Sequence, residues 1–121
     1  MRFYCTDDTV DLEQYPYHVR DVHISDPFIL ADPKSRCYYT YVQFADTERF
    51  PDVETDKENG VFYVLESKDL IHWSKPQICF RQNNFWADKD YWAPEVHIWK
   101  GRYYLFSSFR ADGHYRKCQC L

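Results

Sequence analysis

The sequence has few of the features that mark membrane, nucleic-acid-binding or helical proteins. Its 121 residues include only three glycines and one methionine. No apolar run reaches the ~18 residues of a membrane-spanning helix, and the first residues lack the apolar core of a signal peptide. A net charge of -4 and a pI near 5.7 provide no excess of Lys and Arg for binding phosphates. We therefore expect no membrane or nucleic-acid partner, and a cytoplasmic location is favoured.

Cysteine is present but forms no pairing pattern. The five cysteines are Cys5, Cys37, Cys79, Cys118 and Cys120. An odd number without a Cys-x-x-Cys pair predicts neither a disulfide framework nor a zinc ribbon, so buried free thiols are expected. The spacing of the histidines also matches no metal-binding motif. We expect no metal and no cofactor.

Aromatic residues are abundant. They make up 20% of the chain, with eleven Tyr, nine Phe and four Trp. Aromatic side chains favour strands, and the length corresponds to one domain or less. A mean hydropathy of -0.69 is typical of a soluble protein. The composition predicts an all-β fold.

Two stretches of the chain repeat one design, in which an acidic residue and a proline lead into an apolar strand, a turn and an aromatic strand. The expected strand ranges are 26–30 and 37–44 in the first copy, and 92–99 and 102–109 in the second. Pro27 and Pro94 are 67 residues apart, which sets the period. Two further strands are expected at Gly60–Ser67 and Pro76–Phe80, with Trp73 packed beneath the turn that joins them. A last strand is expected over 114–121.

A fixed period with four strands per unit is typical of a β-propeller, in which four-stranded sheets are arranged radially. A β-sandwich is the alternative; the propeller is favoured because each unit repeats a carboxylate at the start of its innermost strand. The predicted organisation is a lead-in over residues 1–20, a first four-stranded blade over 21–82 and an incomplete second blade over 83–121. A propeller needs at least four blades. We therefore expect this chain to be part of a longer protein.

Three segments carry a family resemblance. They are Asp26–Leu30, Tyr91–Val96 and the hairpin that starts at Gly60–Tyr63 and ends in the turn Ser67–Trp73. In order and spacing they resemble glycoside hydrolase family 43, which consists of five-bladed β-propeller enzymes acting on arabinose- and xylose-containing glycans. The resemblance implies a β-propeller of the five-bladed type, with about the first two blades present, and an oligosaccharide or polysaccharide substrate.

The resemblance also implies a catalytic residue. Asp26 matches the general base of the family. An inverting glycosidase needs two carboxyl groups about 6.5–9.5 Å apart, one to activate water and one to protonate the leaving oxygen. The family's general acid and a second, pKa-tuning aspartate lie on later blades and have no counterpart in this sequence. The chain by itself is therefore expected to be inactive. The competing interpretation of Asp26 is a turn residue at a strand entry.

Three further residues are candidates for contacting the sugar. Glu95 matches the acidic position of the family's Trp-Ala-Pro-Asp/Glu segment and is expected to contact substrate; its use as the general acid is the less favoured alternative. Trp92 and Trp86 offer aromatic faces on which a sugar ring could stack. Packing between blades is the competing interpretation for both tryptophans.

Two other functions stay open. The chain could be a non-catalytic carbohydrate-binding or interaction module, or part of a related propeller glycosidase or glycoside phosphorylase. An incomplete propeller also leaves unpaired strand edges, which template pairing with other chains. Self-association through these edges is therefore expected.

Overall fold

A computed structural model describes residues 10–43, 50, 61–81, 83, 85–113 and 117–120. These residues are mostly strands, and their one helical element is a short 3₁₀ turn. The elements are β1 (Tyr17–His18), η1 (Val19–Asp21), β2 (Phe28–Asp32), β3 (Cys37–Val42), β4 (Val61–Ser67), β5 (His72–Trp73), β6 (Gln77–Arg81), β7 (Lys89–Trp99), β8 (Arg102–Arg110) and β9 (Lys117–Cys120). Within the described part of the chain, no helix is long and apolar enough to cross a membrane.

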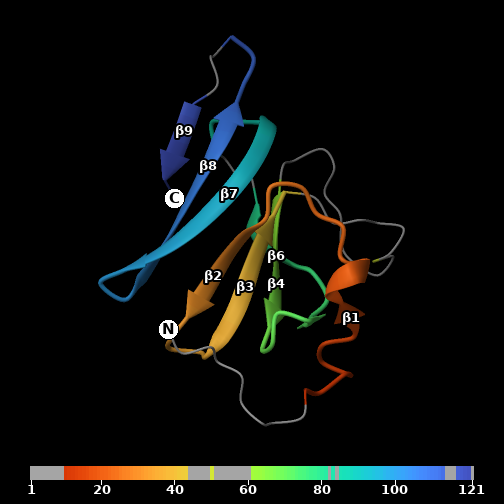
Figure 1. Cartoon of the computed structure of the whole chain (residues 1–121). Coiled ribbons are helices and arrows are strands. Elements are labelled where there is room, and N and C mark those ends of the chain that lie inside the picture. The colour runs from red at the N-terminus through yellow and green to blue at the C-terminus, as the bar shows by residue number, and fades with distance from the viewer. Residues whose placement is uncertain are drawn as a thin grey trace.

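The strands form two antiparallel sheets (Figure 1). In the first sheet β4 pairs with β3 on one side and with β6 on the other, and β3 pairs with β2. These are the four strands expected for the first blade. Strand β2 begins two residues later than predicted, at Phe28, and continues to Asp32. The boundaries predicted for the lead-in and the two blades remain predictions.

The lead-in contains a strand that the sequence did not indicate. Tyr17 and His18 pair with Trp73 and His72, so β1 and β5 extend the first sheet beyond β4. The Val19 N–H adds a hydrogen bond to the Ile71 carbonyl, 2.7 Å away. A strand of two residues, Tyr17 and His18, is too short to show a periodic pattern. Its partner strand, His72–Trp73, lies within the stretch that the sequence predicted to be a turn. Part of the lead-in is therefore a strand of the first sheet.

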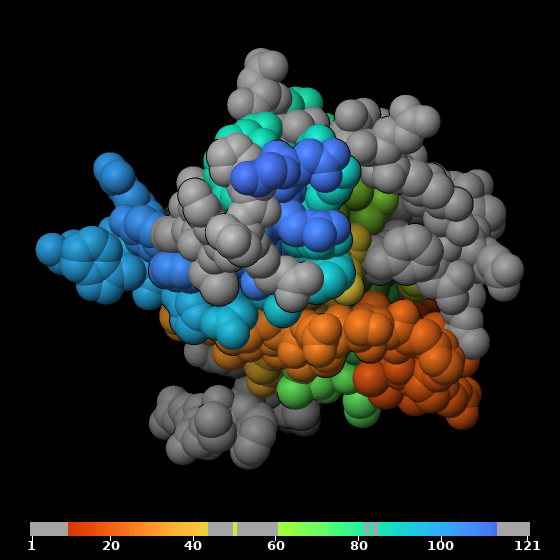
Figure 2. Space-filling view, turned by 90° about the horizontal axis from the view of Figure 1, so that it is seen from above, coloured from red at the N-terminus to blue at the C-terminus, as the bar shows by residue number. Residues whose placement is uncertain are grey.

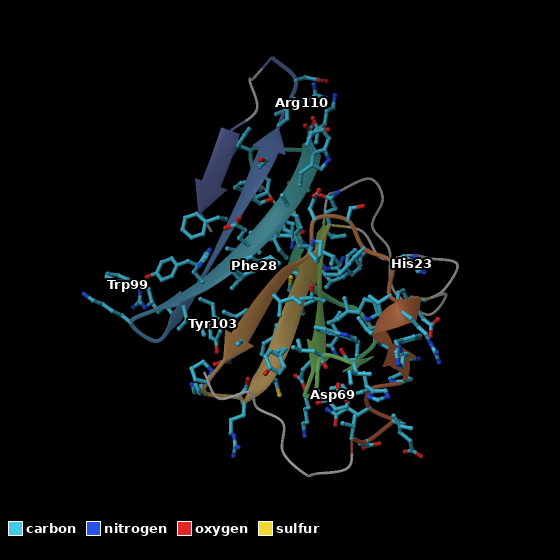
Figure 3. All side chains as sticks on the ribbon, in the orientation of Figure 1. His23, Phe28, Asp69, Trp99, Tyr103 and Arg110 are labelled. Carbon is cyan, nitrogen blue, oxygen red and sulfur yellow. The ribbon has the colours of Figure 1, made fainter. Side chains whose placement is uncertain are left out.

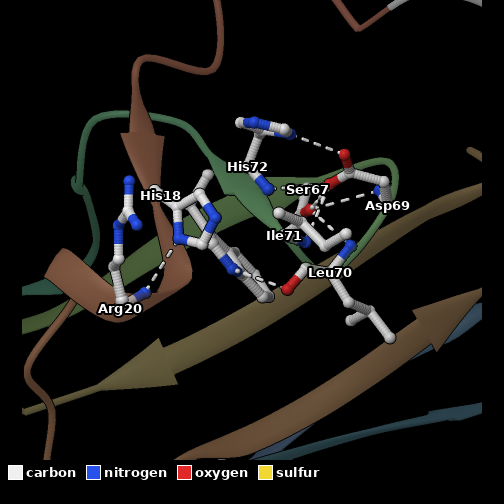
Figure 4. A network of polar contacts seen from close by, with 8 residues as sticks. His18, Arg20, Ser67, Asp69, Leu70, Ile71 and His72 are labelled. Atoms are coloured by element: carbon white, nitrogen blue, oxygen red, sulfur yellow. Dashed lines mark hydrogen bonds and ion pairs between the residues drawn. The ribbon is translucent and has the colours of Figure 1, made fainter.

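The turn between β4 and β5 is organised by Ser67 and Asp69 (Figure 4). Asp69 Oδ1 accepts hydrogen bonds from the N–H groups of Ile71 and His72 at 2.8 and 2.7 Å, and Oδ2 lies 2.7 Å from His72 Nδ1. Burial by itself would raise the pKa of Asp69, but these hydrogen bonds lower it below its ordinary value. The turn places Trp73 in the core as predicted, with its Nε1–H donating to the Leu70 carbonyl.

The second sheet consists of β7, β8 and β9. Lys100 and Gly101 join β7 to β8, and their φ angles of 48° and 74° belong to the left-handed region that two-residue hairpin turns use. The tip of this hairpin projects from the rest of the molecule (Figure 2). Strand β7 begins at Lys89, three residues earlier than predicted. The last strand is observed as β9, while residues 114–116 and 121 lie outside the described part.

The two sheets meet through a cluster of aromatic residues. Phe62 on β4 and Phe109 on β8 are both completely buried, and their ring centroids are 6.0 Å apart. Tyr91 on β7 packs edge-on against Phe109 at 5.0 Å. Burial raises the pKa of Tyr91 to about 12, and its hydroxyl donates to the Ala87 carbonyl. Truncating a ring such as that of Phe62 to alanine typically costs about 3–5 kcal/mol, so this cluster fixes the position of β7 against the first sheet.

A second core cluster lies on the opposite face of the first sheet. Its buried members are Tyr38, Val42, Val61, Tyr63, Leu65 and Trp73. Because Phe62 faces the other cluster, β4 is buried on both faces. Cys37 is buried, as expected, but Cys79 is exposed, so the prediction of buried thiols is wrong for Cys79. Cys79 lies at the register shift in the pairing of β6 with β4, where its Sγ donates to the Phe62 carbonyl at 3.4 Å.

Candidate active site

Asp26 lies in a bend directly before β2, with its side chain exposed. Its φ angle is 48°, in the left-handed region, and Pro27 follows it. A residue with a Cβ pays about 1–2 kcal/mol for this conformation, and a following proline restricts it further. The bend therefore presents the carboxylate to solvent at the entry of a strand, on backbone held in one uncommon conformation.

The segment Trp92–Glu95, within β7, also contains a residue with a positive φ angle directly before a proline. Ala93 has a φ of 49° and precedes Pro94. The pairing of β7 with β8 shifts register on both sides of Trp92, so the strand bulges here. Two side chains support the bulge: Ser107 Oγ donates to the Trp92 carbonyl at 2.6 Å, and the Ala93 N–H donates to Gln43 Oε1 at 3.1 Å. Such bulges re-aim side chains and occur next to active sites.

The repeat assigns Glu95 a different position from the one expected. Asp26 and Ala93 both precede the proline of their unit and share one backbone conformation. Ala93 is therefore the counterpart of Asp26, and Glu95 stands where the first unit has Phe28. The expectation that both units carry a carboxylate at the start of the innermost strand is corrected: in the second unit that position is an alanine.

Glu95 faces a groove on the outer side of the second sheet. The groove encloses about 770 Å³ and is lined by Ala93, Glu95, His97, Trp99, Tyr104, Phe106, Ser107 and Ser108. Glu95 Oε2 lies 3.2 Å from His97 Nε2. The His97 ring in turn packs against Phe28 of β2, with ring centroids 5.1 Å apart, and Figure 3 shows Phe28 beside β7. Asp26 and Trp92 are not among the lining residues, so this groove is separate from the bend that carries Asp26.

The two candidate stacking tryptophans are partly accessible. Trp86 is 37% and Trp92 39% exposed, although the Trp86 ring also contacts Phe85 at 5.5 Å. Each therefore combines a packed edge with a surface that a ligand could reach. Their assignment to sugar binding stays a prediction.

Sequence reasoning missed Gln43 and the aromatic side chains of the groove. Trp99, Tyr104 and Phe106 could have been found from the alternation of residues along two adjacent strands, since every second residue faces the same side. Gln43 had no such signal, because its partner is 50 residues away. Among the described residues, no three His, Cys, Asp or Glu side chains gather as a metal site would require.

A buried carboxylate joins the two sheets at the other end of β2. Asp32 is 2% exposed, and its Oδ2 accepts a hydrogen bond from the Tyr103 hydroxyl at 2.7 Å. Figure 3 shows Tyr103 directed from β8 toward the end of β2. Burial opposes the charge, but hydrogen bonds from Tyr103, from the Lys34 N–H and from Ser35 lower the pKa of Asp32 below its ordinary value. The bond to Asp32 in turn raises the pKa of Tyr103.

The repeated sheets and the exposed carboxylate before β2 define a partial β-propeller of the glycosidase type. The family model of glycosyl hydrolases family 43 matches residues 18–119, so this chain belongs to that family. No curated protein matches the sequence. The fold is similar to the crystal structure of an endo-arabinase from Bacteroides thetaiotaomicron VPI-5482, with a TM-score of 0.70 and 31% sequence identity. The match covers 88% of this chain and 33% of that one, so this chain spans about a third of the endo-arabinase.

Proposed function

We propose that this chain forms the first two blades of a longer glycosidase that hydrolyses arabinose- or xylose-containing glycans with inversion. The proposal rests on Asp26, an exposed carboxylate held before β2 in a chain of family 43. The similarity to an endo-arabinase at 31% identity favours arabinose-containing glycans.

In the proposed mechanism Asp26 is the general base. Its carboxylate accepts a proton from a water molecule, whose oxygen attacks the anomeric carbon from the face opposite the leaving group. The exposed position of Asp26 leaves room for that water and for the sugar. A carboxylic acid from a later blade protonates the leaving oxygen. Trp92 and Trp86 stack on sugar rings, and Glu95 contacts the substrate.

The test compares two aspartates in the protein expressed from the complete coding sequence. Asp26→Asn should lower the rate of hydrolysis of linear arabinan and of aryl arabinofuranosides and xylosides by at least about 100-fold, since general-base catalysis contributes about 10²–10⁴. Asp21→Asn is the matched control. Asp21 is also exposed and lies five residues earlier, but no proline follows it. Equal activity of the two variants would refute the assignment of Asp26.

The 121-residue chain itself is proposed to be inactive because a two-carboxylate mechanism cannot run on Asp26 alone. The purified chain should show no turnover of an aryl arabinofuranoside or xyloside above the buffer rate. Turnover that Asp26→Asn abolishes would contradict this and would make Glu95 the first acid to examine.

The groove favours a second candidate function, which is carbohydrate binding without hydrolysis. It combines the aromatic side chains of Trp99, Tyr104 and Phe106 with the Glu95 carboxylate, the kinds of group that line carbohydrate sites. Titration of the chain with arabinotriose, followed through the indole N–H resonances, distinguishes the glycosidase function from carbohydrate binding in the groove. A shift of Trp99 alone supports binding in the groove, whereas a shift of Trp92 supports the glycosidase site.

A further inference from the structure

Gln43 connects the two sheets at the candidate active site. It follows the last residue of β3, and its half-buried side chain reaches the second sheet, where Oε1 accepts the Ala93 N–H at 3.1 Å. The amide oxygen of one residue thus links β3 to the bulge at Trp92–Glu95.

Gln43 and Asp26 flank the same end of the β2–β3 ladder. Phe28 pairs with Tyr41 as the last pair of this ladder. Asp26 lies in the bend two residues before Phe28, and Gln43 lies in the bend two residues after Tyr41. The strands that lead to these two bends are therefore paired with each other.

The bulge needs such a partner. The register shift between Trp92 and Glu95 removes Ala93 from the regular ladder, which leaves its N–H without a strand partner. A backbone donor left unpaired destabilises the conformation, and a left-handed alanine persists only where its surroundings hold it. Ser107 supports the Trp92 carbonyl from β8, and Gln43 supports the Ala93 N–H from β3.

We propose that Gln43 is a positioning residue for glycan binding. Its side-chain oxygen fixes the bulge, and the bulge sets the directions of Trp92 and Glu95 relative to Asp26. This inference rests on the proposed glycosidase function and deepens it: the Gln43 amide, at the end of β3, holds the substrate-binding bulge of β7 against the sheet that carries Asp26.

Two variants of Gln43 distinguish the effect of the hydrogen-bond acceptor from the effect of the size of the side chain. Gln43→Met keeps a similar length and volume but removes the oxygen, and Gln43→Glu keeps an oxygen at the same position. In the 121-residue chain, hydrogen exchange of the Ala93 amide should become about fivefold faster or more in Gln43→Met, as expected for loss of a typical hydrogen bond. Exchange should stay within about twofold of wild type in Gln43→Glu, and the Val96 amide should be unchanged in both.

The second readout is sugar affinity, measured by tryptophan fluorescence with α-1,5-linked arabinotriose and β-1,4-linked xylotriose. Gln43→Met should weaken binding of the preferred trisaccharide about tenfold, and Gln43→Glu should restore it. Unchanged Ala93 exchange in Gln43→Met, or equal loss of affinity in both variants, overturns the proposal. If the wild-type chain binds neither sugar, the proposed function fails for this chain, and the exchange rates still decide whether Gln43 holds the bulge.

Discussion

Asp26, in the bend before β2, and Ala93, within β7, have nearly the same positive φ angle. Their φ angles are 48° and 49°, and each residue directly precedes a proline, 67 residues apart in the chain. An L-residue adopts this conformation only where the fold imposes it. The repeated unit therefore preserves a backbone turn at the entry of its innermost strand, while the side chain at that turn changes from a carboxylate to a methyl group.

The strain at Ala93 can be measured with glycine. Ala93→Gly should raise the free energy of unfolding by about 0.5–1 kcal/mol, because relief of the left-handed strain exceeds the entropy that glycine adds to the unfolded chain. Urea unfolding of the 121-residue chain provides the measurement.

Ala31→Gly is the matched control for this substitution. Ala31 is an exposed residue of β2 without a positive φ, so glycine there should lower the free energy of unfolding by about 0.5–1 kcal/mol. Opposite signs for the two variants are expected. The same sign would show that Ala93 is not strained in solution.

The hydrogen bond between Asp32 and Tyr103 should make stability depend on pH in acid. The pKa of Asp32 is lower in the folded than in the unfolded protein, so its contribution is fully present above about pH 4, the ordinary pKa of aspartate. As the pH falls through the folded pKa, the unfolded state binds the proton more readily and the contribution is lost.

Urea unfolding between pH 2.5 and 7 tests this prediction. Asp32→Asn should lower stability at pH 7 and flatten the dependence on pH below 4. Tyr103→Phe removes one donor to Asp32 and moves its folded pKa toward the unfolded value, so stability should fall less between pH 4 and 2.5 than in wild type. Identical pH profiles for wild type and Asp32→Asn would exclude a role of Asp32 in acid stability.

Thr40 offers a stabilising substitution. It is 1% exposed in β3, and its Oγ1 has no hydrogen-bond partner among the described residues. Thr40→Val replaces the hydroxyl with a methyl group of similar size and should raise the free energy of unfolding by about 1 kcal/mol, because a buried unpaired hydroxyl costs about 1–3 kcal/mol. Thermal and urea unfolding should agree in sign. Destabilisation would mean that the hydroxyl has a partner in solution.

Self-association through an open strand edge remains a prediction. In the described part of the first sheet β2 pairs with β3 alone, and Ile29 of β2 is 48% exposed. Light scattering should show a mass that rises with concentration, and Ile29→Lys should reduce it because edge lysines oppose strand pairing. Ile71→Lys, at an equally exposed position in the β4–β5 turn, should have no effect. A monomer at every concentration would contradict the prediction.

The sequence by itself determined the longer strands, their order and the family, but not the two-residue strands β1 and β5. Alternation and aromatic content are local properties, so β3, β4 and the Lys100–Gly101 turn were predictable from a few neighbouring residues. The repeat of Pro27 and Pro94 identified the architecture, and the motif around Asp26 identified the candidate base.

Only the tertiary structure decided which residues join the two sheets. The contact of Gln43 with Ala93 and that of Asp32 with Tyr103 join residues 50 and 71 positions apart, across two sheets. These contacts form only because the cluster of Phe62 and Phe109 packs one sheet against the other in a fixed position. No local sequence pattern predicts that position. The positive φ angles of Asp26 and Ala93 likewise came only from the structure, because a motif records side chains and not the backbone conformation that carries them.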